Sequence, residues 1–229
     1  MDAFSLISWL TLEVHLPNRP FSYRETPEDL QALRQLLRTC ALPHLSPSLP
    51  PQRHILNLAC GRSDETGLLA ELFSHPTGET KFTGIDIRAA ELDEATARWT
   101  SRKNPKLQAN FLTLDATKLP LLREMPQPTH LVFFRHQNFW NGPQLWTTLF
   151  DHALHQLHSE GLLIITSYFD KEHMLALTAF ESLGAHLLST LKNPRSRDIP
   201  QTSGKSVDRH IAVFSLNPPK HKDSSILLR

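Results

Sequence analysis

The chain has 229 residues, of which 40% are hydrophobic and 21% are charged, and its formal net charge is +1. This length can bury one substantial core and fits a single large domain with extensions better than two domains. A chain so close to neutral has no global attraction for nucleic acid or a membrane surface, and no apolar run approaches the roughly 20 residues that span a bilayer. Its two cysteines, Cys40 and Cys60, lie in different segments, which argues against a structural disulfide or a zinc knuckle. We therefore expect a soluble, cytoplasmic protein.

Residues 1–52 are predicted to form an N-terminal helical extension that ends in a proline-rich linker. The apolar segment 4–10 lacks a preceding basic residue and a following cleavage site, so we expect a packed helix rather than a secretory signal. A second helix is expected to begin at Thr26, where Thr26-Pro27-Glu28-Asp29 combines a capping hydroxyl, an early proline and two acids. Its stripe of leucines suits a cover over the sheet or the substrate mouth, or a cap helix that makes no substrate contact. The prolines between 43 and 51 favour an extended connection.

From residue 53 to residue 217, apolar runs alternate with helical patterns, which is typical of a parallel sheet with helical crossovers. The last two strands are joined by a stretch without a helical pattern, which allows an antiparallel pair at the sheet edge. The expected fold is an α/β domain with a seven-stranded, doubly wound, mostly parallel sheet and a C-terminal antiparallel edge hairpin. Residues 218–229 are expected to be a disordered tail. The expected strands are 54–59, 81–86, 109–114, 129–134, 161–167, 185–191 and 209–216, and the expected helices 64–74, 88–103, 141–158 and 170–183.

Two short segments carry most of the functional information. The first, His54-Ile55-Leu56-Asn57-Leu58-Ala59-Cys60-Gly61, is an apolar run that ends in a turn of small residues, and the second, Gly84-Ile85-Asp86-Ile87, ends in an acid. A carboxylate at the end of a second strand can accept both ribose hydroxyls of an adenosine-containing cofactor. We therefore expect a nucleoside site at Asp86. The alternative role of Asp86 is to cap the helix that begins near Arg88.

The order of elements over about residues 54–216 resembles that of the class I S-adenosylmethionine-dependent methyltransferases, which are Rossmann-like proteins. In that family the first turn reads acid-x-Gly-x-Gly-x-Gly, and the matching residues here are Asn57, Ala59, Gly61 and Ser63. Gly61 permits the close backbone approach that the turn requires, whereas the side chains of Ala59 and Ser63 narrow the space for the methionine moiety of the cofactor. Asn57 keeps a hydrogen-bond acceptor but loses the charge. The resemblance implies S-adenosylmethionine as the cofactor, and a fold that has lost its cofactor is the alternative.

The same resemblance implies which residues hold the cofactor. The first turn would contact the methionine end, and Asp86 would bind the ribose. Asp115 matches the family position that meets the adenine amino group, with a turn-forming aspartate as the alternative. The complete set of expected cofactor-binding residues is Asn57, Ala59, Cys60, Gly61, Asp86, Ile87, Asp115, Ala116 and Arg135.

The end of the fourth strand is expected to carry the reacting groups, because this edge of an open parallel sheet faces the ligand crevice. Here Arg135 and His136 are the predicted catalytic residues. His136 could act as a general base on a hydroxyl or amine, or donate a hydrogen bond to a substrate carboxylate beside Arg135. A purely structural histidine is the alternative. The family's amino-group methyltransferases of nucleic acids and glutamine carry an Asn/Asp-Pro-Pro-aromatic motif at this point, and its absence here disfavours that subclass. Aminopropyl transfer, another activity of the same fold, needs a carboxylate at this edge, where this chain has Arg135 and His136, so a polyamine product is not expected.

A basic loop before the last strand suggests a substrate with a carboxylate or phosphate, although surface solvation explains its charges nearly as well. A nucleic-acid substrate would need a broader basic footprint. The expected substrate-binding residues are Asn138, Arg195, Arg197 and Arg209, with Lys205 in the same loop. Three further histidines, at 152, 155 and 158, are predicted to lie on an ordinary packed helix rather than to bind a metal ion.

Together these patterns predict an enzyme that transfers a methyl group from S-adenosylmethionine to an oxygen or nitrogen of a small, anionic molecule. The alternatives are a non-catalytic Rossmann-like binding module, for which the thinned glycine turn speaks, and a methyltransferase that acts on RNA or protein. RNA binding would be recognised by its steep weakening at high salt.

Overall fold

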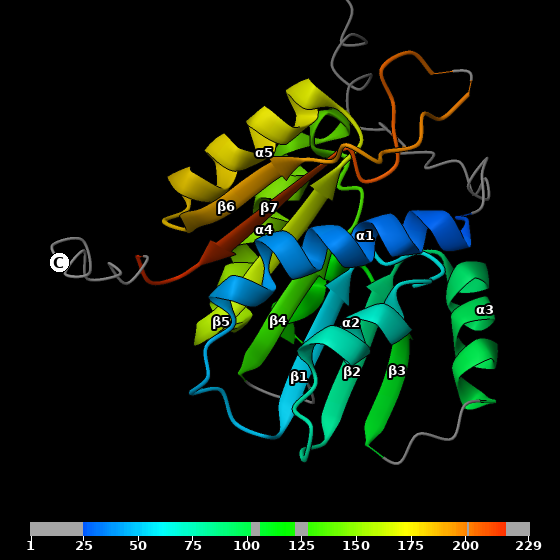
Figure 1. The fold of residues 1–229 in the computed structure, drawn as a ribbon, viewed down its shortest axis with the longest axis vertical. Coiled ribbons are helices and arrows are strands. Elements are labelled where there is room, and N and C mark those ends of the chain that lie inside the picture. The colour runs from blue at the N-terminus through cyan, green and yellow to red at the C-terminus, as the bar shows by residue number, and fades with distance from the viewer. Residues whose placement is uncertain (1–24, 102–105, 122–127, 201, 219–229) are drawn as a thin grey trace, which may run out of the picture.

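The computed structural model describes residues 25–101, 106–121, 128–200 and 202–218, and these form a seven-stranded sheet with helices on both faces (Figure 1). The strands are β1 (Arg53–Leu58), β2 (Thr80–Asp86), β3 (Leu107–Thr113), β4 (Thr129–Phe134), β5 (Leu157–Ser167), β6 (His186–Lys192) and β7 (His210–Ser215). The α-helices are α1 (Pro27–Cys40), α2 (Thr66–Phe73), α3 (Ala89–Thr100), α4 (Pro143–Gln156) and α5 (Asp170–Ser182). The helix expected at 4–10 and the tail expected after residue 218 lie outside the described residues, apart from residue 218 itself.

The sheet has the strand order β3-β2-β1-β4-β5-β7-β6. Its first five strands run parallel to their neighbours, and β7 runs antiparallel to both β5 and β6. The predicted fold class is therefore confirmed, including the antiparallel pairing of the last two strands. The last strand of the chain does not form the edge, however. It lies between β5 and β6, so that β6 is the edge strand.

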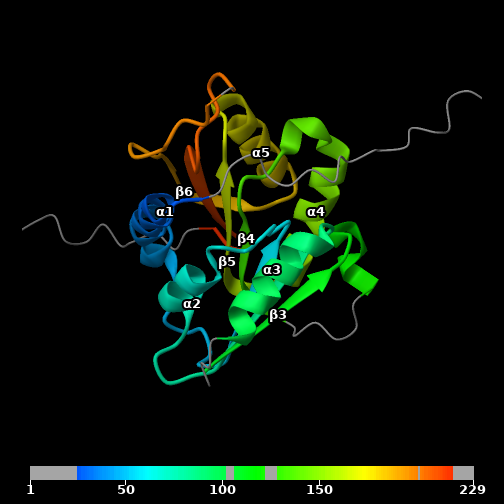
Figure 2. The same cartoon turned by 90° about the vertical axis from the view of Figure 1, so that its right-hand side faces the viewer.

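The two faces of the sheet are covered by different helices (Figure 2). Alternate residues of a strand point to opposite faces, and so Ile55 of β1 packs with α1 and α2 while Leu56 and Leu58 pack on the side of α4 and α5. All six residues of β1 are buried. A strand buried on both faces reads as a continuous apolar run, which explains why β1 was recognisable from the sequence.

Helix α1 begins as the sequence predicts. The Thr26 hydroxyl accepts from the backbone N–H of Asp29, and the Asp29 carboxylate accepts from the backbone N–H of Thr26, which forms a capping box. Leu33 and Leu37 of this helix are fully buried against the sheet. The helix therefore covers one sheet face with its leucine stripe.

Three expectations about local structure differ from the observed elements. The connection before β1 contains a 3-10 turn at Leu42–His44 and further turns rather than an extended chain. Helix α4 ends at Gln156, so that His158 belongs to β5 and does not share a helix with His152 and His155. Strand β5 itself begins at Leu157, earlier than its apolar run, because pairing between Thr129 and Leu157 extends the ladder. Within the described ranges, no helix is both long enough and apolar enough to cross a membrane.

Candidate functional site

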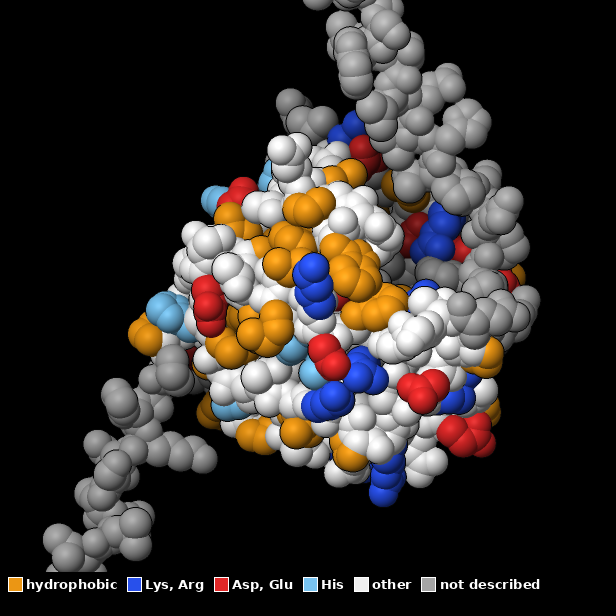
Figure 3. All heavy atoms as spheres, turned by 90° about the horizontal axis from the view of Figure 1, so that it is seen from above, with side chains coloured by type: hydrophobic (Ala, Val, Ile, Leu, Met, Phe, Trp, Pro, Cys, Tyr) orange, Lys and Arg blue, Asp and Glu red, His pale blue; other side chains and the backbone are white. Residues whose placement is uncertain are grey.

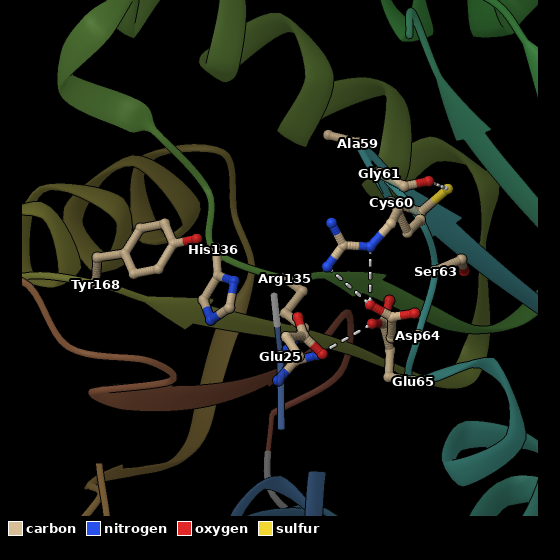
Figure 4. A pocket seen from close by; sticks show the side chains of 11 residues that line it. Glu25, Ala59, Cys60, Gly61, Ser63, Asp64, Glu65, Arg135, His136 and Tyr168 are labelled. Atoms are coloured by element: carbon tan, nitrogen blue, oxygen red, sulfur yellow. Dashed lines mark hydrogen bonds and ion pairs between the residues drawn. The ribbon is translucent and has the colours of Figure 1, made fainter. Parts of the chain in front are cut away.

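A cleft lies where the parallel strands end, between the turn after β1 and the ends of β4 and β5 (Figure 4). Its empty space, including the part open to solvent, is about 400 Å³. The crevice at the carboxyl ends of the strands, beside the point where the strand order reverses, is where α/β sheets bind ligands. The cleft is lined by Glu25, Ala59, Cys60, Gly61, Arg62, Ser63, Asp64, Glu65, Arg135, His136 and Tyr168.

The turn after β1 has a left-handed backbone at each position where the resembled family carries glycine. The φ angles are 52° at Ala59, 53° at Gly61 and 51° at Ser63. A side chain makes this conformation unfavourable, so two of these three residues are strained. The turn therefore keeps the backbone path of a glycine-rich turn although its sequence retains one glycine.

Asn57 is linked to a carboxylate that sequence reasoning did not identify. Its Nδ2 atom donates to the Ser63 hydroxyl at 3.0 Å and to Oε1 of Glu65 at 2.5 Å. Glu65 is 2% exposed, and burial raises its pKa even though the charge of Arg135 opposes the rise. Among the described residues the buried Oδ1 atom of Asn57 has no hydrogen-bond partner. Glu65, just before α2, thus places a buried carboxylate beside Asn57 at the end of β1.

Asp86 lies at the end of β2, as expected, and already has several partners. Its Oδ2 atom accepts from the backbone N–H of Gly61 at 2.7 Å, so the carboxylate holds the turn after β1 in place. The Arg88 guanidinium donates to both oxygens, at 2.9 and 3.0 Å, and the Arg88 backbone N–H adds a bond at 3.0 Å. Neighbouring Ile87 is 50% exposed. A ribose at Asp86 would have to take the place of the Arg88 side chain.

Asp115 and Ala116 begin the 3-10 turn after β3. The Asp115 Oδ1 atom accepts from the backbone N–H of Thr117 at 3.0 Å and from its hydroxyl at 2.8 Å. This is the turn-forming role that was the alternative at this position. Ala116 is buried and packs in the core. Neither residue lines the cleft described above.

Arg135 follows β4 and is surrounded by carboxylates. It donates to Glu25, to Glu65 at 3.1 Å, and to both oxygens of Asp208 at 3.1 and 2.5 Å. Burial alone would lower the pKa of Arg135, but the charges of Asp208 and Glu25 raise that pKa well above its ordinary value. For Glu25, by contrast, burial raises the pKa, although the charge of Arg135 opposes this rise. The guanidinium is therefore held in a buried ionic cluster that joins the start of α1 to β4 and to the segment before β7.

His136 has a buried carboxylate beside it. Its Nε2 atom is 3.0 Å from Oδ1 of Asp208, and its ring stacks on Tyr168 with centroids 4.1 Å apart. Burial would raise the pKa of Asp208, yet the charges and hydrogen bonds of Arg135 and His136 hold that pKa well below its ordinary value. Figure 4 shows the imidazole between Tyr168 and Arg135, on the far side of the cleft from the turn after β1. Glu25, Tyr168 and Asp208 had no local sequence signal, because each comes from a distant part of the chain.

The residues expected to bind substrate lie elsewhere or are already paired. Asn138 is exposed and accepts from the Asn141 side chain at 2.9 Å. Arg197 makes an ion pair with Asp29, and Arg209 makes one with Asp170. Arg195 is exposed. None of Asn138, Arg195, Arg197 and Arg209 lines the described cleft.

The cleft suits S-adenosylmethionine at its methionine end. The turn keeps its left-handed path, and Glu65 with the unpartnered Oδ1 of Asn57 provides acceptors that an ammonium group requires. At the ribose end, Asp86 stands in the expected place once Arg88 is displaced. The residues present therefore fit this cofactor, with rearrangement of one side chain.

At the level of sequence, the chain matches no protein-family model and no curated protein. Solved structures nevertheless share its fold. The N-methyltransferase NodS from Bradyrhizobium japonicum WM9 is 15% identical with a TM-score of 0.56, and the match covers 83% of this chain and 94% of NodS. An S-adenosylmethionine-dependent methyltransferase from Clostridium acetobutylicum ATCC 824 is 10% identical with a TM-score of 0.58, over 85% of this chain and 93% of the other. An rRNA methylase from Streptococcus thermophilus is 14% identical with a TM-score of 0.53, over 76% and 93%. The expected methyltransferase fold is thus confirmed.

Proposed function

We propose that this chain, which has the fold of S-adenosylmethionine-dependent methyltransferases, binds S-adenosylmethionine and transfers its methyl group to an oxygen or nitrogen of a small molecule. The observation that carries the proposal is the turn after β1. Residues 59, 61 and 63 of this turn have a left-handed backbone, and the Gly61 N–H donates to Asp86 at 2.7 Å. The neighbours in fold described above include an N-methyltransferase, an S-adenosylmethionine-dependent methyltransferase and an rRNA methylase, and they support the cofactor more than any one acceptor.

In this proposal each part of the cleft has a separate task. Asn57 and Glu65 hold the amino end of the cofactor, and Asp86 holds its ribose. The bound sulfonium supplies an electrophilic methyl group. His136, across the cleft from the turn, accepts the proton of the attacking hydroxyl or amine, while the surrounding buried side chains keep water away. Such a transfer depends mainly on alignment of the nucleophile with the methyl group.

The charges in the cleft favour an acceptor that is neutral or cationic at its reacting end. Arg135 is paired with Glu25, Glu65 and Asp208, so an anionic substrate group would have to displace a buried carboxylate. Arg197 and Arg209 also have carboxylate partners. We therefore propose an alcohol or amine without an anionic group beside Arg135.

A binding module without catalysis is the second candidate. It is favoured by one observation, namely that Glu25 and Arg88 occupy the two places where a ligand would meet Arg135 and Asp86.

An RNA substrate has less support, because acidic and basic side chains are interspersed on the described part of the face toward which the parallel strands point (Figure 3).

Isothermal titration calorimetry with S-adenosylmethionine and S-adenosylhomocysteine tests the cofactor proposal. We expect binding by the unaltered protein, and a loss of affinity of at least about tenfold in Asp86→Asn, since a neutral amide accepts ribose hydroxyls less strongly than a carboxylate. Asp93→Asn, which alters an exposed aspartate of the neighbouring helix α3, is the matched control and should bind normally. Arg88→Gln should bind more tightly, because it removes the competitor for Asp86. No binding of either ligand to the unaltered protein would refute the proposal.

A further inference from the structure

His136 and Asp208 form a buried pair at the proposed reacting end of the cleft. Asp208 is 1% exposed, and its carboxylate lies 3.0 Å from Nε2 of His136. The same carboxylate receives two hydrogen bonds from Arg135, which fix its plane. Because the Arg135 guanidinium donates to both of its oxygens, this carboxylate stays ionised and its position does not depend on the imidazole.

Two contacts compete for the Nε2 atom of His136. Besides the carboxylate oxygen at 3.0 Å, the backbone N–H of Asp208 points at Nε2 from 3.1 Å. In a neutral imidazole Nε2 either donates to the carboxylate or accepts from the N–H. Each arrangement leaves one unfavourable contact. With a lone pair on Nε2, this nitrogen and Oδ1 would be two acceptors 3.0 Å apart, whereas with a proton on Nε2 the ring N–H and the backbone N–H would be two donors 3.1 Å apart. The proton on Nε2 is favoured, because its hydrogen bond to the ionised Oδ1 is charge-assisted, whereas the bond from the backbone N–H joins two neutral groups.

The backbone at both residues shows that the pair is held in place by the surrounding structure. His136 has a φ of 57° and Asp208 a φ of 45°, both in the left-handed region that non-glycine residues rarely adopt. Such strain persists where packing overdetermines it, and it is concentrated at functional sites. The Tyr168 ring, stacked 4.1 Å from the imidazole at an interplanar angle of 16°, fixes the plane of the ring.

The other ring nitrogen remains for the cleft. Among the residues that the structure describes, no hydrogen bond to Nδ1 of His136 is found, and His136 lines the cleft opposite the turn after β1. The charged groups around the ring are Glu25, Arg135 and Asp208. With its proton on Nε2, the neutral imidazole has its lone pair on Nδ1, where an acceptor molecule can reach it.

We propose that Asp208 is a positioning residue that keeps the His136 proton on Nε2, so that Nδ1 receives the proton of the attacking hydroxyl or amine. This deepens the proposed function and rests on it. As the bond from the nucleophile to the methyl carbon forms, the carbon–sulfur bond breaks with its electron pair left on sulfur, and the nucleophile's proton passes to Nδ1. The resulting imidazolium faces the Asp208 carboxylate, which stabilises its charge.

Nitrogen NMR of the imidazole tests this assignment directly in the 229-residue chain without cofactor. Long-range ¹H–¹⁵N spectra over a pH titration distinguish a protonated from an unprotonated ring nitrogen, and His136→Gln identifies the signals. We expect the neutral His136 ring to carry its proton on Nε2. In Asp208→Asn the side-chain amide and the backbone N–H can both donate to Nε2, and so we expect the proton to move to Nδ1. Asp198→Asn, an exposed change in the same loop, should leave the ring unchanged.

A neutral His136 ring with its proton on Nδ1 in the unaltered protein would overturn the inference, and this result does not depend on whether Asp208→Asn folds. A folded Asp208→Asn variant whose ring keeps the proton on Nε2 would also overturn it. Addition of S-adenosylhomocysteine separates the two proposals. A shift of the His136 signals without a change of tautomer supports both, whereas a failure to bind refutes the proposed function and leaves the tautomer result standing.

Discussion

The residues of the turn after β1 show how a glycine-poor sequence can keep the shape of a glycine-rich turn. Ser63 compensates for its left-handed backbone with side-chain hydrogen bonds to Asn57 and Thr66 at 3.0 and 2.8 Å. Ala59 has the same backbone conformation and no polar side chain with which to compensate. The left-handed backbone is therefore more destabilising at Ala59 than at Ser63.

Replacement of Ala59 by glycine should accordingly stabilise the protein. Glycine relieves about 1–2 kcal/mol of left-handed strain, whereas the backbone entropy it adds to the unfolded chain costs about 0.5–1 kcal/mol, so we expect a net gain of about 0–1.5 kcal/mol. Ser63→Gly should instead be neutral or destabilising, because it removes the two side-chain bonds. Urea unfolding of both variants measures the difference. Destabilisation by Ala59→Gly would contradict the strain account.

The site residues that could be predicted are those next to strand ends. Each of these residues follows or ends an apolar run and lies at the carboxyl edge of the sheet, namely Asn57, Gly61, Asp86, Arg135 and His136. The partners Glu25, Glu65 and Asp208 could not be predicted, since their importance comes from contacts across the fold. The sequence suggested that Arg135 could bind a substrate anion. In the structure it is instead paired with three carboxylates.

At the scale of a single element, helix α5 carries two adjacent buried groups with opposite electrostatic behaviour. Burial raises the pKa of Glu172 from 4.5 to about 7, and burial lowers the pKa of His173 from 6.5 to about 4. The folded state therefore favours neutral forms of both. Glu172 accepts from the backbone N–H of Tyr168, and His173 bonds to the hydroxyls of Ser167 and Thr190.

These two shifts should oppose each other in the pH dependence of stability. For Glu172 the folded pKa lies above the unfolded one, so stability falls as pH rises from 4.5 to about 7. For His173 the folded pKa is the lower, so stability falls as pH drops from 6.5 to about 4. Relative to the unaltered protein, Glu172→Gln should steepen the loss of stability in acid by about 2 kcal/mol. His173→Gln should instead steepen the loss toward neutral pH.

Unfolding free energies from urea titrations at about pH 4.5 and 7 measure both changes, since this interval spans the shift of Glu172 from 4.5 to about 7 and most of the shift of His173 from 6.5 to about 4. The two variants serve as controls for each other, because they alter neighbouring residues of one helix. Equal pH dependence in the two variants would show that burial does not shift these groups in opposite directions.

At the scale of the whole molecule, the last strand of the sequence, β7, lies inside the sheet rather than at its edge. Strand β7 is hydrogen-bonded to β5 on one side and β6 on the other, and Ile211, Ala212, Val213 and Phe214 are fully buried. Phe214 stacks on Phe180 of α5 with centroids 4.6 Å apart. The C-terminal strand is therefore part of the core rather than an appendage at the edge.

Hydrogen exchange should reveal this arrangement. Amides of β7 are paired between two strands, so we expect them to exchange as slowly as those of β1, β4 and β5, near the rate of global unfolding. Amides on the outer side of the edge strands β3 and β6 should exchange faster. Mass spectrometry or NMR measures these rates. Exchange of β7 as fast as that of β6 would contradict the central position of β7.

The sequence by itself determined the order of strands and helices, the parallel character of most of the sheet and the place of the turn after β1. These follow from local apolar runs and small-residue turns, whose spacing is set by backbone geometry. Only the tertiary structure decided that β7 lies between β5 and β6, that the Glu65 carboxylate lies beside Asn57, and that Asp208 lies beside His136. These are contacts between segments far apart in the chain, and they are selected by packing and charge pairing in the folded core, which no local pattern records.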